Sequence, residues 1–297
     1  MRVTITGLGL IGGSMARDLR RTRFATRIIG VESDADNARR ALELGLVDAI
    51  LPLPEAISDA DVVALAVPVD KIAELLPAIL SAIPEGTTVC DLGSAKKHIG
   101  QLVENHPRRR NYVAAHPMAG TENSGPDAAM ERMFAGKICI VCDYEKSGPQ
   151  HLALIEKMLQ MLGMNIAYMT SDEQDHSTAY ISHLPHALAF ALANAVQSKE
   201  DRSIIFDLAS GGFQSTVRLA KSAPDMWGPI FSQNREYVLE SLDAYMRHLA
   251  ELRDSISGDE PKMYELMAHA NNVRGILAGE NSSLIRDEEK IVKLYKR

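Results

Sequence analysis

The protein has 297 residues, of which 46% are hydrophobic and 24% are charged, and its formal net charge is -7 at pH 7. These values are ordinary for a globular protein, and the negative charge argues against nucleic acid as the main partner. No apolar run approaches the roughly eighteen residues that a membrane span needs, and the N-terminus has no signal-peptide pattern, so we expect a cytoplasmic protein without a membrane partner.

A glycine pattern follows the first β-branched run of the chain. Residues 3–6 predict a buried strand, and a helical pattern runs over residues 13–21. Gly7, Gly9 and Gly12 have the spacing G-x-G-x-x-G, in which the glycines allow a tight turn, close approach of a pyrophosphate and close packing of the helix on the strand. The helix N-terminus favours phosphates through its unpaired N–H groups and its dipole. We therefore predict a dinucleotide site rather than a strand–turn–helix without a ligand.

An acidic residue lies at the end of the second apolar run. Glu32 follows Gly12 by twenty residues, where a carboxylate can accept hydrogen bonds from both ribose hydroxyls and repel a 2′-phosphate. This favours NAD over NADP as the cofactor. Arg39 and Arg40 on the next helix are able to reach a phosphate, but we interpret them as a solvated helix face.

The later apolar runs complete a sheet. We predict strands over residues 27–32, 61–67, 87–91, 112–115, 137–141 and 165–168. Because helical patterns alternate with these strands, the sheet should be mostly parallel and doubly wound. The three cysteines, Cys90, Cys139 and Cys142, are too few for a disulfide framework, and we interpret them as core residues.

The character of the chain changes at Thr170, after which no strand pattern appears. We therefore predict an α/β domain with a Rossmann-type doubly wound sheet over residues 1–169 and an all-α domain over residues 170–297. One large domain is the alternative. Ser171 and Gln174 have the spacing of a capping box, which predicts the start of a helix.

The helix that follows is apolar nearly all round to about Val196, which predicts that it is buried. Pro185 predicts a kink over residues 181–184. A later helix has an apolar seam with spacings of three and four, which indicates a packing face. The seam consists of Val238, Leu242, Tyr245, Leu249, Leu252 and Ile256. We predict a homodimer through the helical domain, although the seam is also able to pack within its own chain.

Two loops follow predicted strands at the edge where doubly wound sheets bind ligands. Gly93 and Ser94 come just after one strand, where the nicotinamide half of a cofactor would lie. His116 comes at the end of the next strand, where it is placed as a general base or as a hydrogen-bond partner of a substrate hydroxyl. The predicted cofactor contacts are Gly7, Gly9, Leu10, Ile11, Gly12, Glu32, Val67, Pro68 and Gly93.

The helical half contributes further candidates. His176, His183 and His186 share one helix face, which is compatible with a metal site, but Pro185 disturbs the spacing and we interpret them as a polar pocket lining without a metal. Arg218 lies among apolar residues in the sequence, so we expect a buried guanidinium that binds a substrate carboxylate. The alternative is a salt bridge to an acidic side chain.

Five motifs in this order resemble the prephenate or arogenate dehydrogenase family of tyrosine biosynthesis. They are the glycine pattern over residues 7–14, the Gly93-Ser-Ala-Lys96 loop, His116-Pro-Met-Ala-Gly-Thr-Glu122, Ser182-His-Leu-Pro-His186 and Met226-Trp227. The resemblance implies oxidative decarboxylation of prephenate to 4-hydroxyphenylpyruvate, with a hydride passing to NAD. It covers about residues 2–252.

The resemblance also implies roles for single residues. His116 would take or polarise the proton of the C4 hydroxyl, and Ser94 would bond both His116 and the hydroxyl. Arg218 would hold a substrate carboxylate. The other implied pocket residues are His183 and His186, which would shape it, and Glu122 and Trp227, which would gate it.

One tract departs from the family pattern. The family often has F-R-D-x-T-R where this chain has Phe213-Gln-Ser-Thr-Val-Arg218, so the charge around the substrate side chain differs and prephenate or arogenate is the open choice. Two other functions remain. A related reductase would normally use a helix lysine as proton donor, and the helix after Ser171 has none before Lys199. A non-catalytic NAD sensor would tolerate replacement of His116.

Overall fold

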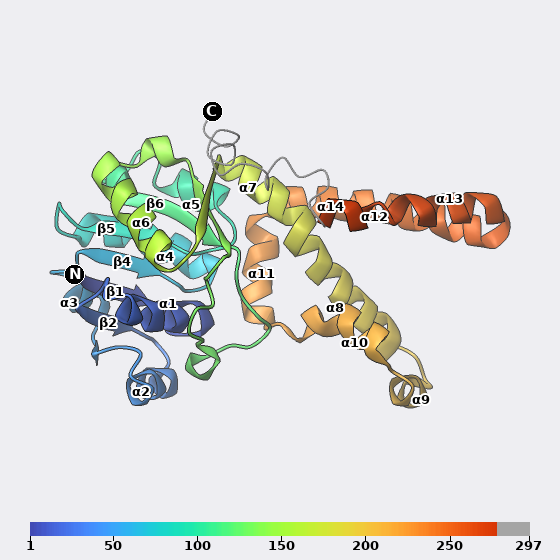
Figure 1. Ribbon diagram of the computed structural model, residues 1–297, viewed down its shortest axis with the longest axis horizontal. Coiled ribbons are helices and arrows are strands. Elements are labelled where there is room, and N and C mark those ends of the chain that lie inside the picture. Colours follow the sequence, from blue (N-terminus) through green and yellow to red (C-terminus); the bar gives the residue numbers. More distant parts are fainter. Residues whose placement is uncertain (278–297) are drawn as a thin grey trace. The chain divides into compact units, whose positions relative to one another are not determined.

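Eight strands form a single sheet in the computed structural model, which describes residues 1–277 (Figure 1). The strand order is β3-β2-β1-β4-β5-β6-β7-β8, and the neighbours pair in parallel except for β6 and β7, which are antiparallel. The predicted doubly wound, mostly parallel sheet is confirmed. The strands are β1 (Arg2–Thr6), β2 (Arg27–Val31), β3 (Ala49–Ile50), β4 (Val62–Leu65), β5 (Thr88–Asp91), β6 (Tyr112–Pro117), β7 (Ile138–Cys142) and β8 (Asn165–Met169).

Helices connect the strands and cover the sheet. They are α1 (Leu10–Arg21), α2 (Ala35–Glu43), α3 (Leu53–Ile57), α4 (Val69–Ala82), α5 (Lys97–Leu102) and α6 (Pro149–Met161), with the short turns η1 (Arg109–Asn111), η2 (Pro126–Ala128) and η3 (Tyr144–Lys146). The strand order reverses between β1 and β4, so the carboxyl ends of these two strands form the crevice in which such folds bind ligands.

The core is built from side chains on both faces of the central strands. Strand β4 is buried at every position, and it packs with α4 through Leu65, Ile72 and Leu76, all without exposed surface. Burial of each such side chain contributes about 1.5–3 kcal/mol. The same cluster includes Trp227 and Ile230, so a helix that follows the sheet in the sequence is packed against α4. The cysteines Cys90, Cys139 and Cys142 are buried free thiols.

The chain after the sheet is helical. Its elements up to residue 234 are α7 (Ser171–Thr178), the π-helical turn η4 (Ala179–His183), α8 (Leu184–Gln197), α9 (Arg202–Asp207), α10 (Gly211–Val217), the 3₁₀ turn η5 (Arg218–Lys221) and α11 (Pro224–Gln233). The kink predicted before Pro185 takes the form of the π-helical turn, because proline removes one backbone hydrogen bond.

Two expectations about this helix are corrected. The capping box begins one residue earlier than expected, at Thr170, whose hydroxyl accepts from the backbone N–H of Glu173 and whose own backbone N–H donates to the carboxylate of Glu173. The hydroxyl of Ser171 instead donates to Asp143 at 2.5 Å. The helix is also not buried all round, since Ile181 is 65% exposed and Leu192 is 37% exposed.

The described chain divides into two compact units, residues 1–234 and the unit that begins at Arg235. The second unit contains α12 (Arg235–Gly258), α13 (Glu260–Ala270) and α14 (Val273–Leu277). Residue 169 ends the last strand, but α11 packs against α4, so the compact units divide later than the change in secondary structure. The domain boundary at 169/170 stays a prediction.

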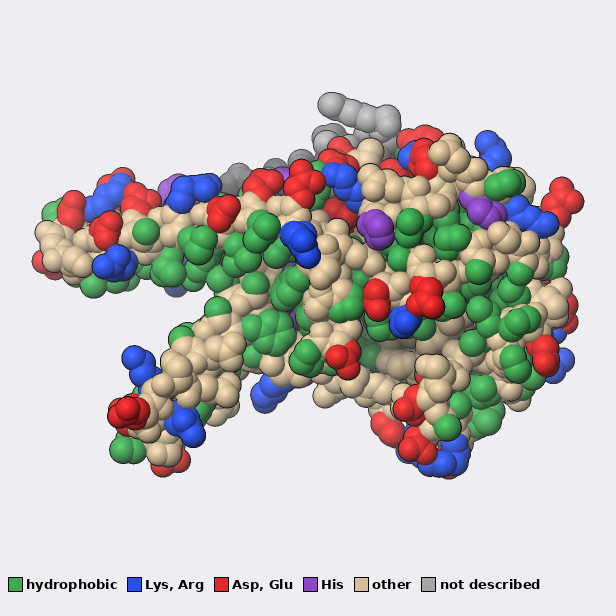
Figure 2. Space-filling model, turned by 180° about the vertical axis from the view of Figure 1, so that it is seen from behind, with side chains coloured by type: hydrophobic (Ala, Val, Ile, Leu, Met, Phe, Trp, Pro, Cys, Tyr) green, Lys and Arg blue, Asp and Glu red, His purple; other side chains and the backbone are tan. Residues whose placement is uncertain are grey.

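Apolar side chains are exposed along the second unit. Figure 2 shows hydrophobic side chains along one edge of the paired helices α12 and α13. On the predicted seam, Val238 is buried, but Tyr245, Leu249 and Ile256 are 37%, 49% and 65% exposed. Among residues 1–277, no helix is both long enough and apolar enough to span a membrane.

Candidate active site

The three glycines of the G-x-G-x-x-G pattern are required for different reasons. Gly7 has φ +86°, and a Cβ there would lie 2.6 Å from the carbonyl oxygen of Ala66. A Cβ on Gly12 would lie 1.9 Å from the carbonyl oxygen of Gly7. By contrast, the nearest atom to a Cβ on Gly9 is the nitrogen of Gly125, at 3.8 Å. Gly7 and Gly12 are therefore required by the fold, whereas Gly9 leaves open space for a ligand beside the backbone.

Helix α1 presents a bare N-terminus to this space. It begins at Leu10 after Gly9, and no side chain caps it or places a negative charge in its first turn. Its unpaired N–H groups and the positive end of its dipole therefore remain for an anion. Val67 lies beside Gly7, and Pro68 precedes α4 as its N-cap residue after the carboxyl end of β4. Ile11, in the first turn of α1, is half-buried. These residues are the ones that would hold the phosphate part of a dinucleotide.

Glu32 lies at the end of β2 and holds the glycine loop. Its carboxylate accepts hydrogen bonds from the N–H groups of Leu8 at 2.9 Å, Ser33 at 2.9 Å and Asp34 at 3.1 Å. These bonds orient the carboxylate beside the loop, where it would accept hydrogen bonds from a ribose and would repel a 2′-phosphate.

The two arginines of α2 have acidic partners. Arg39 pairs with Asp36 at 2.7 Å, and Arg40 pairs with Asp127 at 2.7 Å and with Glu43 at 3.0 Å. The interpretation of these arginines as a solvated helix face therefore agrees with the structure, which adds that both are paired with carboxylates.

A buried charge network supports the loop after β5. The carboxylate of Asp91 accepts from the N–H of Gly93 at 3.0 Å, from the hydroxyl of Tyr112 at 2.6 Å and from the ammonium of Lys96. The side chains of Asp91 and Lys96 are fully buried. A buried ion pair is tolerated when further hydrogen bonds satisfy it, as they do here. The network fixes the backbone of residues 91–97, which includes Ser94.

Helix α7 holds the same loop from the other side. Asp175 accepts hydrogen bonds from the backbone N–H groups of Lys96 at 2.7 Å and Lys97 at 2.9 Å. Gln174 donates to the carbonyl oxygen of Ser94 at 3.1 Å. The sequence interpretation missed these contacts of Gln174 and Asp175, because polar residues in a first helical turn are usually explained by capping.

His116 lies at the carboxyl end of β6 and is 8% exposed. Its Nδ1 is 2.9 Å from Nε2 of Gln174, so the amide takes the place expected for Ser94 as its hydrogen-bond partner. Burial lowers the pKa of His116 to about 3, and the charges of Lys96 and His183 act in the same direction. The imidazole is therefore neutral at pH 7.

Two of the three helical histidines lie together around Trp227. His186 stacks on Trp227 with ring centroids 3.6 Å apart, and the ring of His183 meets Trp227 edge-on at 5.8 Å. His183 Nδ1 is 3.1 Å from the amide nitrogen of Asn234. Burial lowers the pKa of His183 to about 4. Nε2 of His183 and Nε1 of Trp227 are buried and have no hydrogen-bond partner in the described part of the chain, so both remain for a polar ligand.

The expected burial of Arg218 is wrong. Its side chain is 51% exposed, and its guanidinium pairs with Glu122 at 2.9 Å. The salt bridge was the alternative interpretation, and it forms because the loop after β6 brings Glu122 to the end of α10. Backbone hydrogen bonding, together with the guanidinium of Arg218, lowers the pKa of Glu122. His176 lies apart from this group, against the ring of Tyr180.

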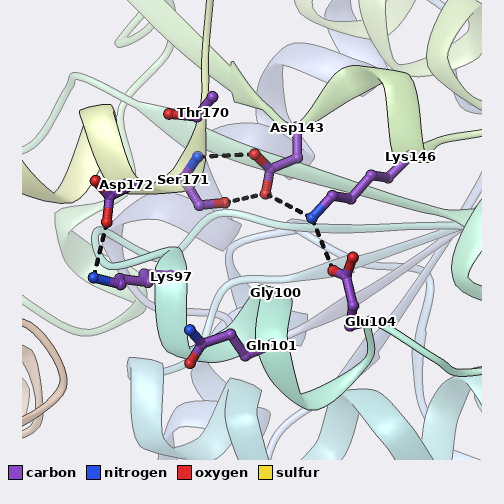
Figure 3. Close-up of a pocket in the computed structure, with 9 residues that line it drawn as sticks. All are labelled: Lys97, Gly100, Gln101, Glu104, Asp143, Lys146, Thr170, Ser171 and Asp172. Carbon is purple, nitrogen blue, oxygen red and sulfur yellow. Dashed lines mark hydrogen bonds and ion pairs between the residues drawn. The ribbon is translucent and has the colours of Figure 1, made fainter.

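A separate surface hollow lies between α5 and the start of α7 (Figure 3). Its charged side chains pair with one another, Lys97 with Asp172 at 2.8 Å and Lys146 with Glu104 at 2.8 Å. The lining holds two ammonium groups and three carboxylates, the third being that of Asp143, which accepts hydrogen bonds from Ser171, and it does not include His116.

Comparison with known proteins identifies the family. A family model described as "Prephenate dehydrogenase, nucleotide-binding domain" matches residues 15–168, and one described as "Prephenate dehydrogenase, dimerization domain" matches residues 170–269. The chain belongs to the prephenate dehydrogenase family. This confirms the resemblance inferred from the five sequence motifs.

Three relatives illustrate the range of this dehydrogenase family. Cyclohexadienyl dehydrogenase of Zymomonas mobilis is 31% identical over 87% of this chain and 89% of its own length. The structure of prephenate dehydrogenase from A. aeolicus in complex with hydroxyphenyl propionate and NAD+ is 30% identical, has a TM-score of 0.85 and covers 93% of this chain and 98% of its own. Synechocystis arogenate dehydrogenase is 29% identical, with a TM-score of 0.74, over 93% of this chain and 100% of its own.

Proposed function

We propose that this member of the family catalyses the NAD-dependent oxidative decarboxylation of prephenate to 4-hydroxyphenylpyruvate. The observation that carries the proposal is the neutral, buried His116, which the network around Lys96 and Gln174 places beside the Ser94 loop at the ligand-binding edge of the sheet. The open space at Gly9 and the bare start of α1 support NAD as the cofactor. The A. aeolicus relative binds NAD+, which also supports it.

The reaction places few demands on acid–base chemistry. When bound, NAD would supply the acceptor for the hydride that leaves C4 of the ring. The bond between C1 and its carboxylate breaks, carbon dioxide leaves, and the electron pair of that bond makes the ring aromatic. The C4 hydroxyl becomes the phenol hydroxyl with its proton still attached, so the overall reaction releases no proton. The protein therefore has to orient the substrate and exclude water rather than remove a proton.

The chain provides groups for each part of the substrate. His116 Nε2 is placed to hydrogen-bond the C4 hydroxyl, and Ser94 lies in the adjoining loop. A carboxylate of the substrate would replace Glu122 as the partner of the Arg218 guanidinium. Within residues 1–277, Nε2 of His183 and Nε1 of Trp227 are buried without a hydrogen-bond partner and would serve the substrate pocket, which His186 shapes through its stacking on Trp227.

Arogenate is the second candidate substrate. It carries an amino group where prephenate carries a keto group, and Glu122 and Arg218 together present a carboxylate beside a guanidinium. Such a pair suits an amino acid, because the carboxylate binds the ammonium and the guanidinium binds the carboxylate. The similarity to the Synechocystis arogenate dehydrogenase supports the same candidate.

The proposed enzyme is a homodimer. The residues that match a dimerization domain include α12 and α13, whose apolar side chains are exposed in the single chain. The exposed set consists of Leu239, Tyr245, Met246, Leu249, Ile256, Tyr264 and Met267. Sedimentation at micromolar concentration should show a dimer, and Leu249→Glu should weaken it. Arg247→Glu is the control: it reverses a charge on the nearly opposite face of the same helix and should not weaken the dimer. A monomeric wild type would overturn the proposal.

The deciding experiment measures NADH formation at 340 nm with prephenate and with arogenate, at equal concentrations and with NAD and NADP in turn. The expected result is a higher kcat/KM with prephenate and NAD. His116→Asn should lower kcat by roughly two to four powers of ten with little change in KM. Activity only with another hydroxy acid would indicate a related reductase, and NAD binding without turnover would indicate a sensor.

A further inference from the structure

The connection between β6 and β7 returns to α1 and α2, and its short turn η2 packs against both helices (Figure 1). On α1, the hydroxyl of Ser14 accepts from the N–H of Met130 at 2.9 Å. The carboxylate of Asp18 accepts from the N–H of Arg132 at 3.1 Å. Ser14 and Asp18 have no exposed surface, so buried contacts anchor this part of the connection on α1.

Gly125, just before η2, lies between the glycine pattern and α2. Its nitrogen is 3.8 Å from the position of a Cβ on Gly9, and a Cβ on Gly125 would lie 3.9 Å from Oδ1 of Asn37. A ligand that approaches the backbone of Gly9 therefore comes within reach of Gly125 as well. Among residues 1–277 the N–H of Gly125 has no hydrogen-bond partner, so it remains for an acceptor on a ligand.

An ion pair ties the same segment to α2. Oδ1 of Asp127 accepts hydrogen bonds from Nε of Arg40 at 2.8 Å and from Nη2 of Arg40 at 2.7 Å. The two side chains are 66% and 42% exposed, so the pair adds little to the stability of the whole protein. Because it joins residues that are 87 positions apart, its main effect is to fix the turn around Gly125 against α2.

We propose that residues 125–127 form an outer wall of the dinucleotide site, in which the N–H of Gly125 donates a hydrogen bond to the pyrophosphate and the ion pair of Arg40 with Asp127 holds the wall in position. The start of α1 supplies donors to the same anion, and Gly125 adds one from a distant segment of the chain. Arg40 and Asp127 are positioning residues, because they act on the cofactor through Gly125. The proposal rests on the NAD site of the proposed function and does not depend on the substrate.

The sign of the effect separates this role from a simple effect of charge. The pyrophosphate is negative, so loss of the carboxylate of Asp127 should strengthen NAD binding if charge alone mattered. Loss of the wall predicts weaker binding instead. Either Asp127→Asn or Arg40→Gln already breaks the ion pair, so the second change should add little to the first.

Isothermal titration calorimetry with NAD, in the absence of substrate, measures the effect of the ion pair. Asp127→Asn, Arg40→Gln and the double variant should each raise the Kd for NAD about threefold to fivefold, with Tm nearly unchanged because the pair is exposed. Asp36→Asn is the matched control, since it breaks the pair of Asp36 with Arg39 on the same helix and should not raise the Kd. Unchanged or tighter binding of NAD by Asp127→Asn would overturn the role of the ion pair.

Hydrogen–deuterium exchange tests the contact of Gly125 with the pyrophosphate. Saturating NAD should slow exchange of the Gly125 amide in wild-type protein, as resolved by overlapping peptides from residues 118–128. Adenosine at saturating concentration is the comparison, because it lacks the phosphates, and it should leave this amide unprotected. Equal protection by adenosine would overturn the contact with the pyrophosphate.

The same measurements separate this proposal from the proposed function. If the wild type binds NAD but the Gly125 amide is not protected, the wall is wrong while NAD stands as the cofactor. If NAD protects this amide but the enzyme does not turn over prephenate, the proposed substrate is wrong while the wall stands.

Discussion

The carboxylate of Asp175 accepts a hydrogen bond from the backbone N–H of Lys96 at 2.7 Å, although 79 positions separate the two residues. Its second oxygen accepts from Lys97 at 2.9 Å, and its backbone oxygen accepts from Asn234 at 2.7 Å. One buried residue of α7 thus holds the loop after β5 and the end of α11. Protonation of this carboxylate would remove an acceptor from the loop that includes Ser94.

The first prediction concerns the pH dependence of activity. Burial raises the pKa of Asp175 to about 6, against the hydrogen bonds from Lys97 and Lys96 and their positive charges, whereas the pKa of His116 is about 3. We therefore expect kcat/KM to fall as the pH drops below about 6 because Asp175 becomes protonated. The limb should persist in His116→Asn and disappear in Asp175→Asn. A limb that disappears in His116→Asn instead would assign it to the histidine.

Stability should change in the opposite direction. Because the folded-state pKa of Asp175 lies above its ordinary value, the folded state binds a proton between about pH 6 and pH 4 that the unfolded state does not bind. The free energy of unfolding of the wild type, relative to that of Asp175→Asn, should therefore increase as the pH falls from 7 to 5. Denaturant titrations of both proteins at pH 7 and pH 5 measure this difference in the free energy of unfolding. They also show whether activity is lost at low pH without unfolding.

The glycines of the fingerprint give a second prediction. Gly12→Ala should lower Tm strongly, because the added Cβ would lie 1.9 Å from the oxygen of Gly7. Gly9→Ala should leave Tm nearly unchanged, because no atom lies nearer than 3.8 Å, but it should raise the KM for NAD about tenfold by blocking the pyrophosphate. Thermal melts and NAD titrations of both variants test this, and an unchanged KM in Gly9→Ala would place the phosphates elsewhere.

Glu32 gives the third prediction. Glu32→Ser should narrow the preference for NAD over NADP, because the carboxylate that repels a 2′-phosphate is lost. Glu32→Gln is the control, since it keeps the size of the side chain and an acceptor for Leu8 while removing the charge. The comparison uses kcat/KM with both cofactors, and a wild type that already prefers NADP would contradict the assignment.

Much of the fold could be predicted because its signals are local. Residues 3–6 and 61–67 are β-branched or apolar runs next to glycine or proline, and β1 and β4 form there. The two-residue strand β3 was missed, since it is too short to have a pattern. The antiparallel direction of β7 was also missed, because it depends on the long connection after His116 rather than on the strand itself.

The candidate site was predicted only in part, because its framework depends on contacts between distant segments. His116 and Ser94 follow strands, so their place at the edge of the sheet could be inferred. Gln174 and Lys96 could not be assigned roles, since their partners are set by how α7 packs on the loop after β5. Arg218 was misjudged because its apolar neighbours in the sequence do not cover it in the structure.

The last prediction concerns Arg218 and Glu122, which pair at 2.9 Å, the Arg218 side chain being 51% and the Glu122 side chain 28% exposed. If Arg218 binds a carboxylate present in both the substrate and the transition state, Arg218→Ala should act mainly on the KM for prephenate, raising it about tenfold to a hundredfold with little change in kcat. Because solvent screens an exposed ion pair, this rise in the KM for prephenate should be smaller than the rise that loss of a buried guanidinium would cause.

The variant Glu122→Gln tests whether Glu122 competes with the substrate carboxylate for the guanidinium of Arg218. A substrate carboxylate must displace Glu122 from the guanidinium, so removing the negative charge of Glu122 should lower the KM for prephenate. The same change should raise the KM for arogenate, because the carboxylate that suits its ammonium group is lost. Steady-state kinetics of both variants with both substrates measure these effects. If Glu122→Gln leaves both KM values unchanged and Arg218→Ala lowers only kcat, the pair does not contact the substrate side chain, and the carboxylate is held elsewhere in the pocket.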